Sequence, residues 1–397
     1  MTVAILTGIL TAAALLLLVP AIVYVAQILA AGGGERVRED ADGRRPGLAV
    51  LMPAHDEAAG IAAAIRALMP QLSSGDRLLV VADNCSDDTA AVAASCGAEV
   101  TVRSDATRRG KGYALDHGVR HLAASPPEVV VIVDADCVVA DGALDALART
   151  CESTNRPAQA LYLMQAPPGA GLGQRMAAFA WRVRNEVRPG GWHRLGLPCQ
   201  LMGTGMALPW SLIAGASLAS GSIVEDMQLG IDLALAGAPP TFCPSARVTS
   251  TFPESSEGTL AQRTRWEHGH LSMIAAHGLP LLWRGLLRRR LDLVAMALDL
   301  CVPPLASLVL MLLAAAIAGA VLAGLGGGPA SLAVAVVGLA LSVVATGLAW
   351  RQVGRSIVSL PELLSAPAYA FAKIPIYVRV FTNRQRRWIR TRRNGDR

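Results

Sequence analysis

Two acidic residues, Asp134 and Asp136, follow residues 129–133, a run of five β-branched side chains. Such a run predicts a strand that is buried on both faces, as in a parallel sheet. Ligands of open α/β sheets bind beyond the carboxyl ends of the strands, so both acids are expected at a ligand site. Their hard oxygen atoms suit Mg²⁺ or Mn²⁺ carrying a phosphate. The alternative is that both acids only cap the turn into the next helix.

Polar residues also follow three other predicted strands. These strands cover residues 48–53, 77–82 and 99–103, and the clusters are Pro53-Ala54-His55-Asp56-Glu57, Asp83-Asn84-Cys85-Ser86-Asp87-Asp88 and Arg108-Arg109-Gly110-Lys111-Gly112. Each cluster alone could be turn chemistry. Because the strands of a parallel sheet end on the same edge, the clusters together predict a nucleotide pocket. Lys111 lies between two glycines and could bring a cation close to a phosphate; a surface turn lysine is the alternative.

The predicted strands alternate along the chain with predicted helices. The helices cover residues 58–69, 88–96 and 113–124, and the fourth strand covers residues 128–133. This alternation predicts an α/β domain with a mostly parallel sheet covered on both sides. Another helical pattern opens after Gly221 with Glu225 and Asp226 in its first turn, where a helix terminus favours negative charge. That preference alone would account for both acids.

Two more helices carry residues of interest. In the helix predicted at 259–276, positions 262, 265 and 266 share one face, so that Gln262, Arg265 and Trp266 can meet one site. A core tryptophan with solvated arginines is the alternative. Residues 173–188 predict an amphipathic helix with Met176, Phe179, Ala180 and Val183 on its apolar face. Such a helix either lies on the cytoplasmic leaflet or packs against the sheet.

Three apolar runs, at 3–31, 293–325 and 331–350, account for the hydrophobic share of 53% and the mean hydropathy of +0.42. The first run lacks the basic start of a secretory signal, which predicts a retained membrane anchor. The second contains Asp299 and Pro303-Pro304, so it is expected to be kinked or broken. Arginines flank the runs at positions 36, 38, 44, 45, 284, 288–290, 351 and 355, which predicts that residues 32–292 lie in the cytoplasm.

The predicted layout has five parts. These are a transmembrane helix at 1–31, a basic linker at 32–45, the α/β domain at 46–283, two transmembrane helices at 284–355, and an interfacial or re-entrant segment with a basic tail at 356–397. The tail, at 384–393, predicts attraction to anionic headgroups rather than to nucleic acid. Seven cysteines without Cys-x-x-Cys or a ligand-like spacing to histidine fit a reducing cytosol and argue against a zinc site or a disulfide framework.

Six motifs resemble, in their order, those of the membrane-bound family-2 glycosyltransferases. They are Pro-Ala-His-Asp-Glu from Pro53, Ala-Asp-Asn-Cys-Ser-Asp-Asp-Thr from Ala82, Gly-Lys-Gly-Tyr-Ala-Leu from Gly110, Asp134-Ala-Asp136, Glu225-Asp226, and Gln262-Arg-Thr-Arg-Trp266. That family includes cellulose, chitin and hyaluronan synthases and many lipid glycosyltransferases. The resemblance covers about residues 48–266 and implies a Rossmann-like GT-A domain flanked by transmembrane helices. Asp56 stands where the family usually has Asn.

The resemblance also implies roles for single residues. The donor would be a nucleotide-diphosphate sugar, and the resemblance favours a UDP-sugar. The cofactor would be Mg²⁺ or Mn²⁺. The implied residues are Pro53, Glu57, Asp83, Lys111, Asp134, Arg263 and Arg265 for the donor, Asp134 and Asp136 for the metal, Glu225, Gln262 and Trp266 for the acceptor, and Asp226 as general base. His268 or His270 would add a third metal ligand, unless both are structural.

The expected function is an inverting transfer of the sugar to a lipid or lipid-linked acceptor at the cytoplasmic face of a bacterial inner membrane. A processive polysaccharide synthase is the main competing hypothesis, because the Gln-x-x-Arg-Trp motif is typical of polymerising members. Two further hypotheses are a sugar nucleotidyltransferase and a catalytically inactive scaffold of a polysaccharide-assembly complex. No nucleic-acid partner is expected, whereas partners in polysaccharide assembly would fit a polysaccharide synthase.

Overall fold

The computed structural model describes residues 2–33, 44–253 and 256–382. It divides into two compact units, each built from separate stretches of the chain. Among the described residues, the helical unit contains 2–33, 169–196 and 270–382, and the sheet unit contains 44–168, 197–253 and 256–269. The predicted basic tail and the flanking arginines Arg36 and Arg38 lie outside the described residues.

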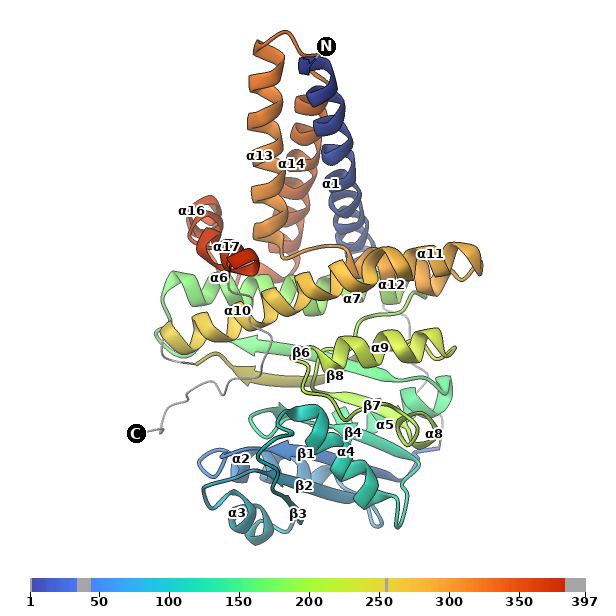
Figure 1. The fold of residues 1–397 in the computed structure, drawn as a ribbon. Coiled ribbons are helices and arrows are strands. Elements are labelled where there is room, and N and C mark those ends of the chain that lie inside the picture. Colours follow the sequence, from blue (N-terminus) through green and yellow to red (C-terminus); the bar gives the residue numbers. More distant parts are fainter. Residues whose placement is uncertain (1, 34–43, 254–255, 383–397) are drawn as a thin grey trace. The chain divides into compact units, whose positions relative to one another are not determined.

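The sheet unit is built on an eight-stranded sheet with the order β3-β2-β1-β4-β7-β6-β8-β5 (Figure 1). Its strands are β1 (Leu48–Ala54), β2 (Arg77–Asp83), β3 (Glu99–Arg103), β4 (Val129–Ile132), β5 (Val138–Val139), β6 (Ala158–Gln165), β7 (Met206–Pro209) and β8 (Thr241–Thr251). β3, β2, β1 and β4 run parallel, as do β6 and β8, whereas β7 is antiparallel to both of its neighbours. The four predicted strands are therefore confirmed, within a sheet of mixed direction.

The helices of this unit are α2 (Ile61–Leu68), the short η1 (Met69–Gln71), α3 (Thr89–Ser95), α4 (Lys111–Leu122), α5 (Ala143–Thr154), α8 (Trp210–Ile213), α9 (Glu225–Leu235) and α10 (Ser256–Met273). Helices lie at the five predicted positions, and the unit also contains η1, α5 and α8, which were not predicted; α10 begins in this unit and ends in the helical unit. The helix predicted at 113–124 starts two residues earlier, because the chain turns at Gly110, whose φ of +133° favours glycine. Lys111 therefore lies in the first turn of α4 rather than in a loop.

The core of the sheet unit fixes α4 and α9 against one face of the sheet. Leu115, Val119 and Leu122 of α4 share a cluster with Leu229 and Leu233 of α9 and with side chains of β1, β2, β4 and β7. A Cβ atom at Gly118 would lie 2.3 Å from Leu51 Cδ1, so the helix rests directly on the strand. This contact holds the first turn of α4 close to the carboxyl ends of the parallel strands.

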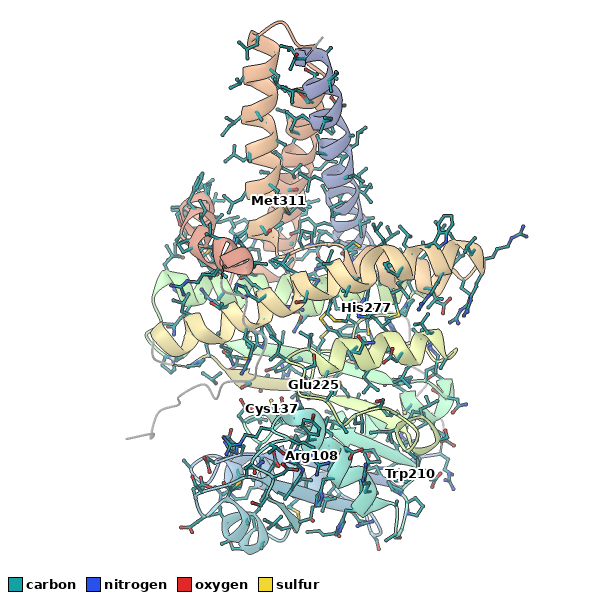
Figure 2. The ribbon with its side chains drawn as sticks, viewed as in Figure 1. Arg108, Cys137, Trp210, Glu225, His277 and Met311 are labelled. Atoms are coloured by element: carbon teal, nitrogen blue, oxygen red, sulfur yellow. The ribbon has the colours of Figure 1, made fainter. Side chains whose placement is uncertain are left out.

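The helical unit contains a bundle of α1 (Thr2–Gly32), α13 (Leu305–Gly324) and α14 (Ala330–Ala349) (Figure 1). Among the described residues, three helices are long and apolar enough to cross a membrane: Thr2–Gly32, Leu305–Gly324 and Ala330–Gly354. Their outer faces carry exposed apolar side chains, such as Met311 on α13 (Figure 2). Each of the three predicted apolar runs therefore overlaps a helix that could span a membrane. The run predicted at 293–325 is broken, because Pro303 and Pro304 lack the N–H groups that a continuous helix needs.

Shorter helices complete this unit. They are α6 (Leu172–Arg182), the π-turn η2 (Val183–Val187), α7 (Arg188–Arg194), the π-turn η3 (Ile274–Gly278), α11 (Leu279–Leu287), α12 (Leu291–Leu300), the π-turn η4 (Trp350–Gly354), α15 (Leu360–Leu364), α16 (Ala366–Phe371) and α17 (Ile374–Thr382). The stretch predicted as interfacial or re-entrant thus forms three short helices, and proline is the second residue of each.

The apolar face predicted for residues 173–188 is wrong in one residue. Met176, Phe179 and Val183 are buried, but Ala180 is exposed and Ala177 is buried in its place. Protein rather than lipid covers this face, since a Cβ atom at Gly354 would lie 2.7 Å from Phe179 Cε2. The interpretation of α6 as a helix with its apolar face in the leaflet is therefore not supported by its packing.

A buried polar network ties α1, α7 and α12 together. The side chain of Gln27 donates to Asp299 Oδ1 at 2.6 Å, and Arg188 donates to Gln27 Oε1 at 2.8 Å and to Asp299 Oδ1 at 2.7 Å. Gln27 is fully buried and Arg188 is 8% exposed. Because each charge and each amide group has a partner, these hydrogen bonds and the ion pair offset the desolvation penalty of burying the network.

Candidate active site

Asp83 ends β2 with a carboxylate whose orientation is set by its neighbours. Its Oδ1 atom accepts hydrogen bonds from Arg103 at 2.6 Å and from Asn84 at 3.0 Å. Arg103 lies over the ring of Tyr113, 5.4 Å from its centre. The Asp83 side chain is 9% exposed and paired with a cation, so its orientation is fixed at the end of β2.

Asp56 and Glu57 lie in the loop after β1, beside the loop after β2. Asp56 Oδ1 accepts hydrogen bonds from the Ser86 backbone N–H at 2.6 Å and from its hydroxyl at 3.1 Å. Burial alone would raise the pKa of Asp56, but these hydrogen bonds lower it below its usual value. Its φ of +52° suits Asp or Asn. Asp56 therefore joins the two loops, while the Glu57 backbone N–H donates to Thr89 Oγ1 at 2.8 Å.

Lys111 extends from the first turn of α4 toward the residues after β4. Its ammonium group donates to Asp134 Oδ1 and, at 2.7 Å, to the carbonyl oxygen of Gly203. Burial alone would lower the pKa of Lys111, but nearby carboxylates, Asp134 foremost, raise it to about 12. The Asp134 backbone N–H is held in turn by Thr204 Oγ1 at 3.0 Å. Lys111 is thus a fixed positive charge at the strand edge.

Asp134 and Asp136 fit a divalent cation. They and Cys137 each offer a ligand atom, and these atoms lie within 4.8 Å of one another. Ser250 supports Asp136 by donating to its backbone oxygen at 3.3 Å and to its Oδ2 atom at 3.4 Å. Two carboxylates leave coordination positions for phosphate and water, as Mg²⁺ and Mn²⁺ sites usually do. Burial raises the pKa of the Cys137 thiol well above its usual value, so it stays protonated and is a poor ligand.

The two predicted histidines have other surroundings. His270 is 4% exposed, and its Nε2 atom is bonded to the carbonyl oxygen of Leu300 at 2.9 Å within the helical unit. Burial lowers the pKa of His270 well below its usual value, and Arg184 and Arg188 add to this effect. His268 is 1% exposed and is absent from the groups of potential metal ligands found among the described residues. A structural role is therefore favoured for both.

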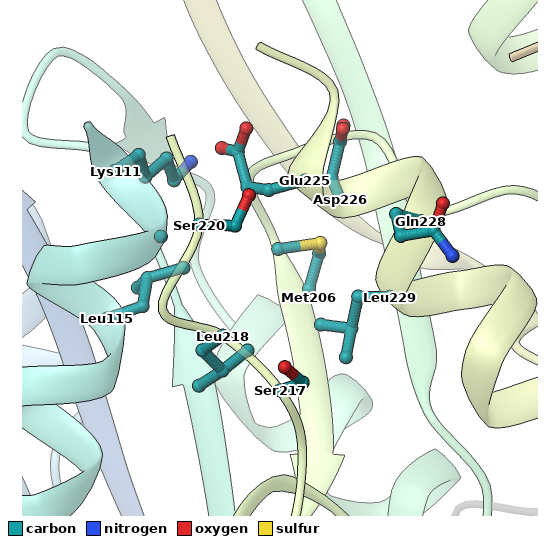
Figure 3. Close-up of a pocket in the computed structure, with 11 residues that line it drawn as sticks. Lys111, Leu115, Met206, Ser217, Leu218, Ser220, Glu225, Asp226, Gln228 and Leu229 are labelled. Atoms are coloured by element: carbon teal, nitrogen blue, oxygen red, sulfur yellow. The ribbon is translucent and has the colours of Figure 1, made fainter. Parts of the chain in front are cut away.

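Glu225 and Asp226 begin α9 and line a pocket together with Lys111 (Figure 3). These three side chains are the charged groups of the lining, and the apolar walls are Leu115, Met206, Leu218 and Leu229. Burial raises the pKa of Glu225 to about 7, and the negative charge of Asp226 adds to this effect. The pocket therefore combines one fixed cation with two acids of which one, Glu225, is readily protonated.

Two glycines bring backbone close to this pocket. Gly203 has a φ of +90°, and a Cβ atom there would lie 3.3 Å from Asp226 Oδ2. A Cβ atom at Gly112 would lie 2.4 Å from the carbonyl oxygen of Leu218 and 2.7 Å from that of Ser220. The loop that carries Ser220 thus rests directly on the first turn of α4. A larger residue at position 112 would displace this loop, which forms one wall of the pocket, and a larger residue at position 203 would press on the Asp226 carboxylate.

Gln262, Arg263, Arg265 and Trp266 lie on α10, as predicted, and their side chains are partly buried. The Gln262 Oε1 atom is buried and accepts no hydrogen bond from the described residues. Gly269 brings α10 against the residue before α9, because a Cβ atom there would lie 2.4 Å from Val224 Cγ1. The helix that carries the Gln-x-x-Arg-Trp motif therefore packs beside the start of the helix that carries Glu225 and Asp226.

The structure thus gathers Lys111, Asp134, Glu225 and Asp226 at one place, with Asp136 two residues beyond Asp134. Pro53 lies on β1, paired in register with Val81 of β2, beside the strand that ends in Asp83. Sequence reasoning missed Thr204 and Ser250, which support the two strand-end acids. Neither residue belongs to a local pattern.

Comparison with known proteins identifies the family. The model of glycosyltransferase-like family 2 matches residues 46–269, more than half of the 397 residues. A glycosyltransferase of Mycobacterium tuberculosis (strain H37Rv), named as uncharacterised, is 35% identical over 147 residues, which are 35% of this chain and 60% of that protein. A glucosyl-3-phosphoglycerate synthase of Mycolicibacterium paratuberculosis is 37% identical over 97 residues, 23% of this chain and 29% of that protein. The chain spans about 60% of the length of the first curated relatives that it matches.

Among solved structures, a mannosyltransferase from Pyrobaculum calidifontis in complex with GDP-Man and Mn²⁺ is similar at a TM-score of 0.60. The match covers 96% of this chain and 100% of that chain, at 18% sequence identity. At that identity the likeness shows the fold, and it confirms the expected GT-A architecture. Because the family model covers the whole stretch from β1 to the end of the Gln-x-x-Arg-Trp helix segment, this chain belongs to glycosyltransferase-like family 2.

Proposed function

We propose that this protein transfers a sugar from a nucleotide-diphosphate sugar to a hydroxyl group of a lipid or lipid-linked acceptor. One observation carries the proposal: the Lys111–Asp134 pair, suited to a phosphate and a metal ion, lies at the same pocket as Glu225 and Asp226. A phosphate site beside a carboxylate is what transfer from a diphosphate leaving group requires. The Pyrobaculum mannosyltransferase, of similar fold, is in complex with GDP-Man and Mn²⁺.

The donor would lie along the strand ends. Asp83, with Pro53 and Glu57 beside it, would receive the base and ribose, and we propose uracil as the base. Lys111, Arg263 and Arg265 would contact the diphosphate. Asp134 and Asp136 would hold Mg²⁺ or Mn²⁺, which when bound supplies Lewis-acid stabilisation of the leaving diphosphate.

The proposed chemistry is one displacement at the anomeric carbon. Asp226 accepts the proton of the acceptor hydroxyl while that oxygen forms a bond to the anomeric carbon. The bond between the anomeric carbon and the diphosphate oxygen breaks, and its electron pair leaves with the nucleotide diphosphate. Lys111 balances the charge that develops on that oxygen. Attack opposite the leaving group inverts the anomeric configuration.

The acceptor would be bound by Glu225, Gln262 and Trp266. Glu225 lines the pocket beside Asp226, the proposed catalytic base. The Oε1 atom of Gln262, which has no hydrogen-bond partner among the described residues, can accept a hydrogen bond from a sugar or lipid hydroxyl. Three apolar helices support a multi-pass protein of the bacterial inner membrane with its catalytic part in the cytoplasm. The second candidate is a processive polysaccharide synthase with assembly partners, which the Gln-x-x-Arg-Trp motif on α10 favours.

The test uses the purified full chain in detergent with Mn²⁺ or Mg²⁺ and a panel of UDP- and GDP-sugars. Release of nucleotide diphosphate is measured with and without a membrane lipid extract. The proposal predicts that the lipid extract increases release from one donor and that each product carries a single transferred sugar. Products with many sugars would favour the polysaccharide synthase. Absence of release from every donor, with no metal-dependent nucleotide binding, would contradict both.

A further inference from the structure

One face of α11 is apolar and exposed to solvent. Leu279 is 76% exposed, Trp283 63%, Leu286 56% and Leu287 65%. At 100° per residue these four side chains fall within an arc of about 100° on the helix surface. Soluble proteins rarely expose so many large apolar side chains together on one face of a short helix. The feature therefore indicates a partner that covers this face.

The other faces of α11 define what kind of partner fits. Arg284 and Arg288 are exposed, four residues apart, and lie beside the apolar stripe. The third side packs against α12, since a Cβ atom at Gly285 would lie 2.9 Å from Val294 Cγ2. Within the described residues, the ion pair at this end of the helix joins Arg290 to Asp292 and does not involve Arg284 or Arg288. An apolar stripe flanked by a basic stripe is typical of a helix that lies in a membrane interface with anionic headgroups.

The position of α11 within the helical unit agrees with this partner. α12, on which α11 packs, bonds through Asp299 to Gln27, five residues before α1 ends at Gly32. α13 begins at Leu305, directly after the Pro303-Pro304 break. α11 and α12 run across the axis of the three-helix bundle, at the end where α1 terminates (Figure 1). Both helices thus lie at the level where the apolar spans end.

We propose that α11 inserts Leu279, Trp283, Leu286 and Leu287 into the acyl-chain boundary of the cytoplasmic leaflet, while Arg284 and Arg288 bind anionic lipid headgroups. Tryptophan is favoured at that depth, because its ring is apolar and its N–H group can still reach water or a headgroup. This inference rests on the membrane placement in the proposed function. It assigns a lipid-binding role to a helix outside the sheet unit.

The test places the full chain in liposomes that contain phosphatidylcholine or phosphatidylglycerol with brominated acyl chains, which quench tryptophan fluorescence on contact. Subtracting the signal of Trp283→Phe from that of the wild type isolates the quenching of Trp283. The control is Trp210→Phe, on α8 of the sheet unit. We expect that Trp283→Phe removes a measurable share of the quenching and that Trp210→Phe removes none.

The basic stripe is tested with R284Q/R288Q. One kcal/mol per arginine corresponds to about fivefold, so this variant, which removes two, should reduce the preference of Trp283 for brominated phosphatidylglycerol by roughly 25-fold. R66Q/R120Q, exposed arginines on α2 and α4, should leave the preference unchanged.

Each contrary outcome has a defined meaning. If the protein does not float with the liposomes, the membrane placement and this inference both fail. If it floats but Trp283 is not quenched, only this inference fails. Cross-linking between two chains through a photoreactive residue at position 283, without quenching, would show that a second copy covers the face instead.

Discussion

Replacing Glu225 with Gln should change how the stability of the protein depends on pH. Burial raises the pKa of Glu225 from 4.5 to about 7. Between these two pH values the unfolded chain releases the proton while the folded chain keeps it, so the free energy of unfolding falls as the pH rises. The contribution of Glu225 is therefore present below pH 4.5 and lost above about pH 7, and its full size is at most about 3 kcal/mol. Gln is neutral at every pH and has nearly the same shape.

The assay is thermal unfolding of the detergent-solubilised wild type and Glu225→Gln at pH 5 and pH 8, followed by intrinsic fluorescence. Between pH 5 and pH 8 the wild type loses about 2.5 kcal/mol of this contribution. We therefore expect the variant to gain on the wild type at pH 8 by about 5 °C relative to pH 5, at about 2 °C per kcal/mol for a chain of this size. Glu152→Gln, an exposed acid on α5, serves as the matched control and should show no such gain. The reasoning is refuted if the difference between wild type and Glu225→Gln is the same at both pH values.

Three further substitutions probe other contacts. Gly112→Ala should lower the free energy of unfolding by about 1–3 kcal/mol and slow transfer, because the added Cβ atom would displace a wall of the pocket. Gly60→Ala is the control, because a Cβ atom there would have nothing within 4 Å. Equal effects of the two substitutions would argue against the close contact at Gly112. Arg188→Met should destabilise the helical unit by about 3–5 kcal/mol, because it leaves Asp299 buried without its cation. Adding Asp299→Asn should restore most of the loss, and failure to do so would contradict the pairing. Asp136→Asn should weaken Mn²⁺ binding, measured by electron paramagnetic resonance, at least tenfold; unchanged affinity would exclude this residue as a ligand.

The sequence predicted the strand-end part of the site because that part depends on local patterns. A β-branched run predicts its own strand, and the residues after a strand must lie at its end. The three apolar spans were predictable for the same reason, since length and hydropathy are properties of one segment. The break in the second span also followed from Pro303 and Pro304.

The remaining features depend on contacts between distant residues. The Lys111 ammonium group bonds to the carbonyl oxygen of Gly203, 92 residues away, and no local pattern encodes that distance. β6 and β8 pair in parallel across a bulge at Ala160/Leu161, which the alternation of side chains did not indicate. Residues 169–196 leave the sheet unit and join the helices near the spans, because Arg188 finds its partners on α1 and α12.

The most direct test of the central claim is sugar transfer by Asp226→Asn. The measurement compares transfer by this variant and by the wild type at saturating donor and Mn²⁺, together with the affinity of each for the nucleotide diphosphate. If Asp226 accepts the acceptor proton, transfer should fall at least a hundredfold while nucleotide affinity stays within about threefold. Transfer at the wild-type rate would contradict the assignment of Asp226 as the base.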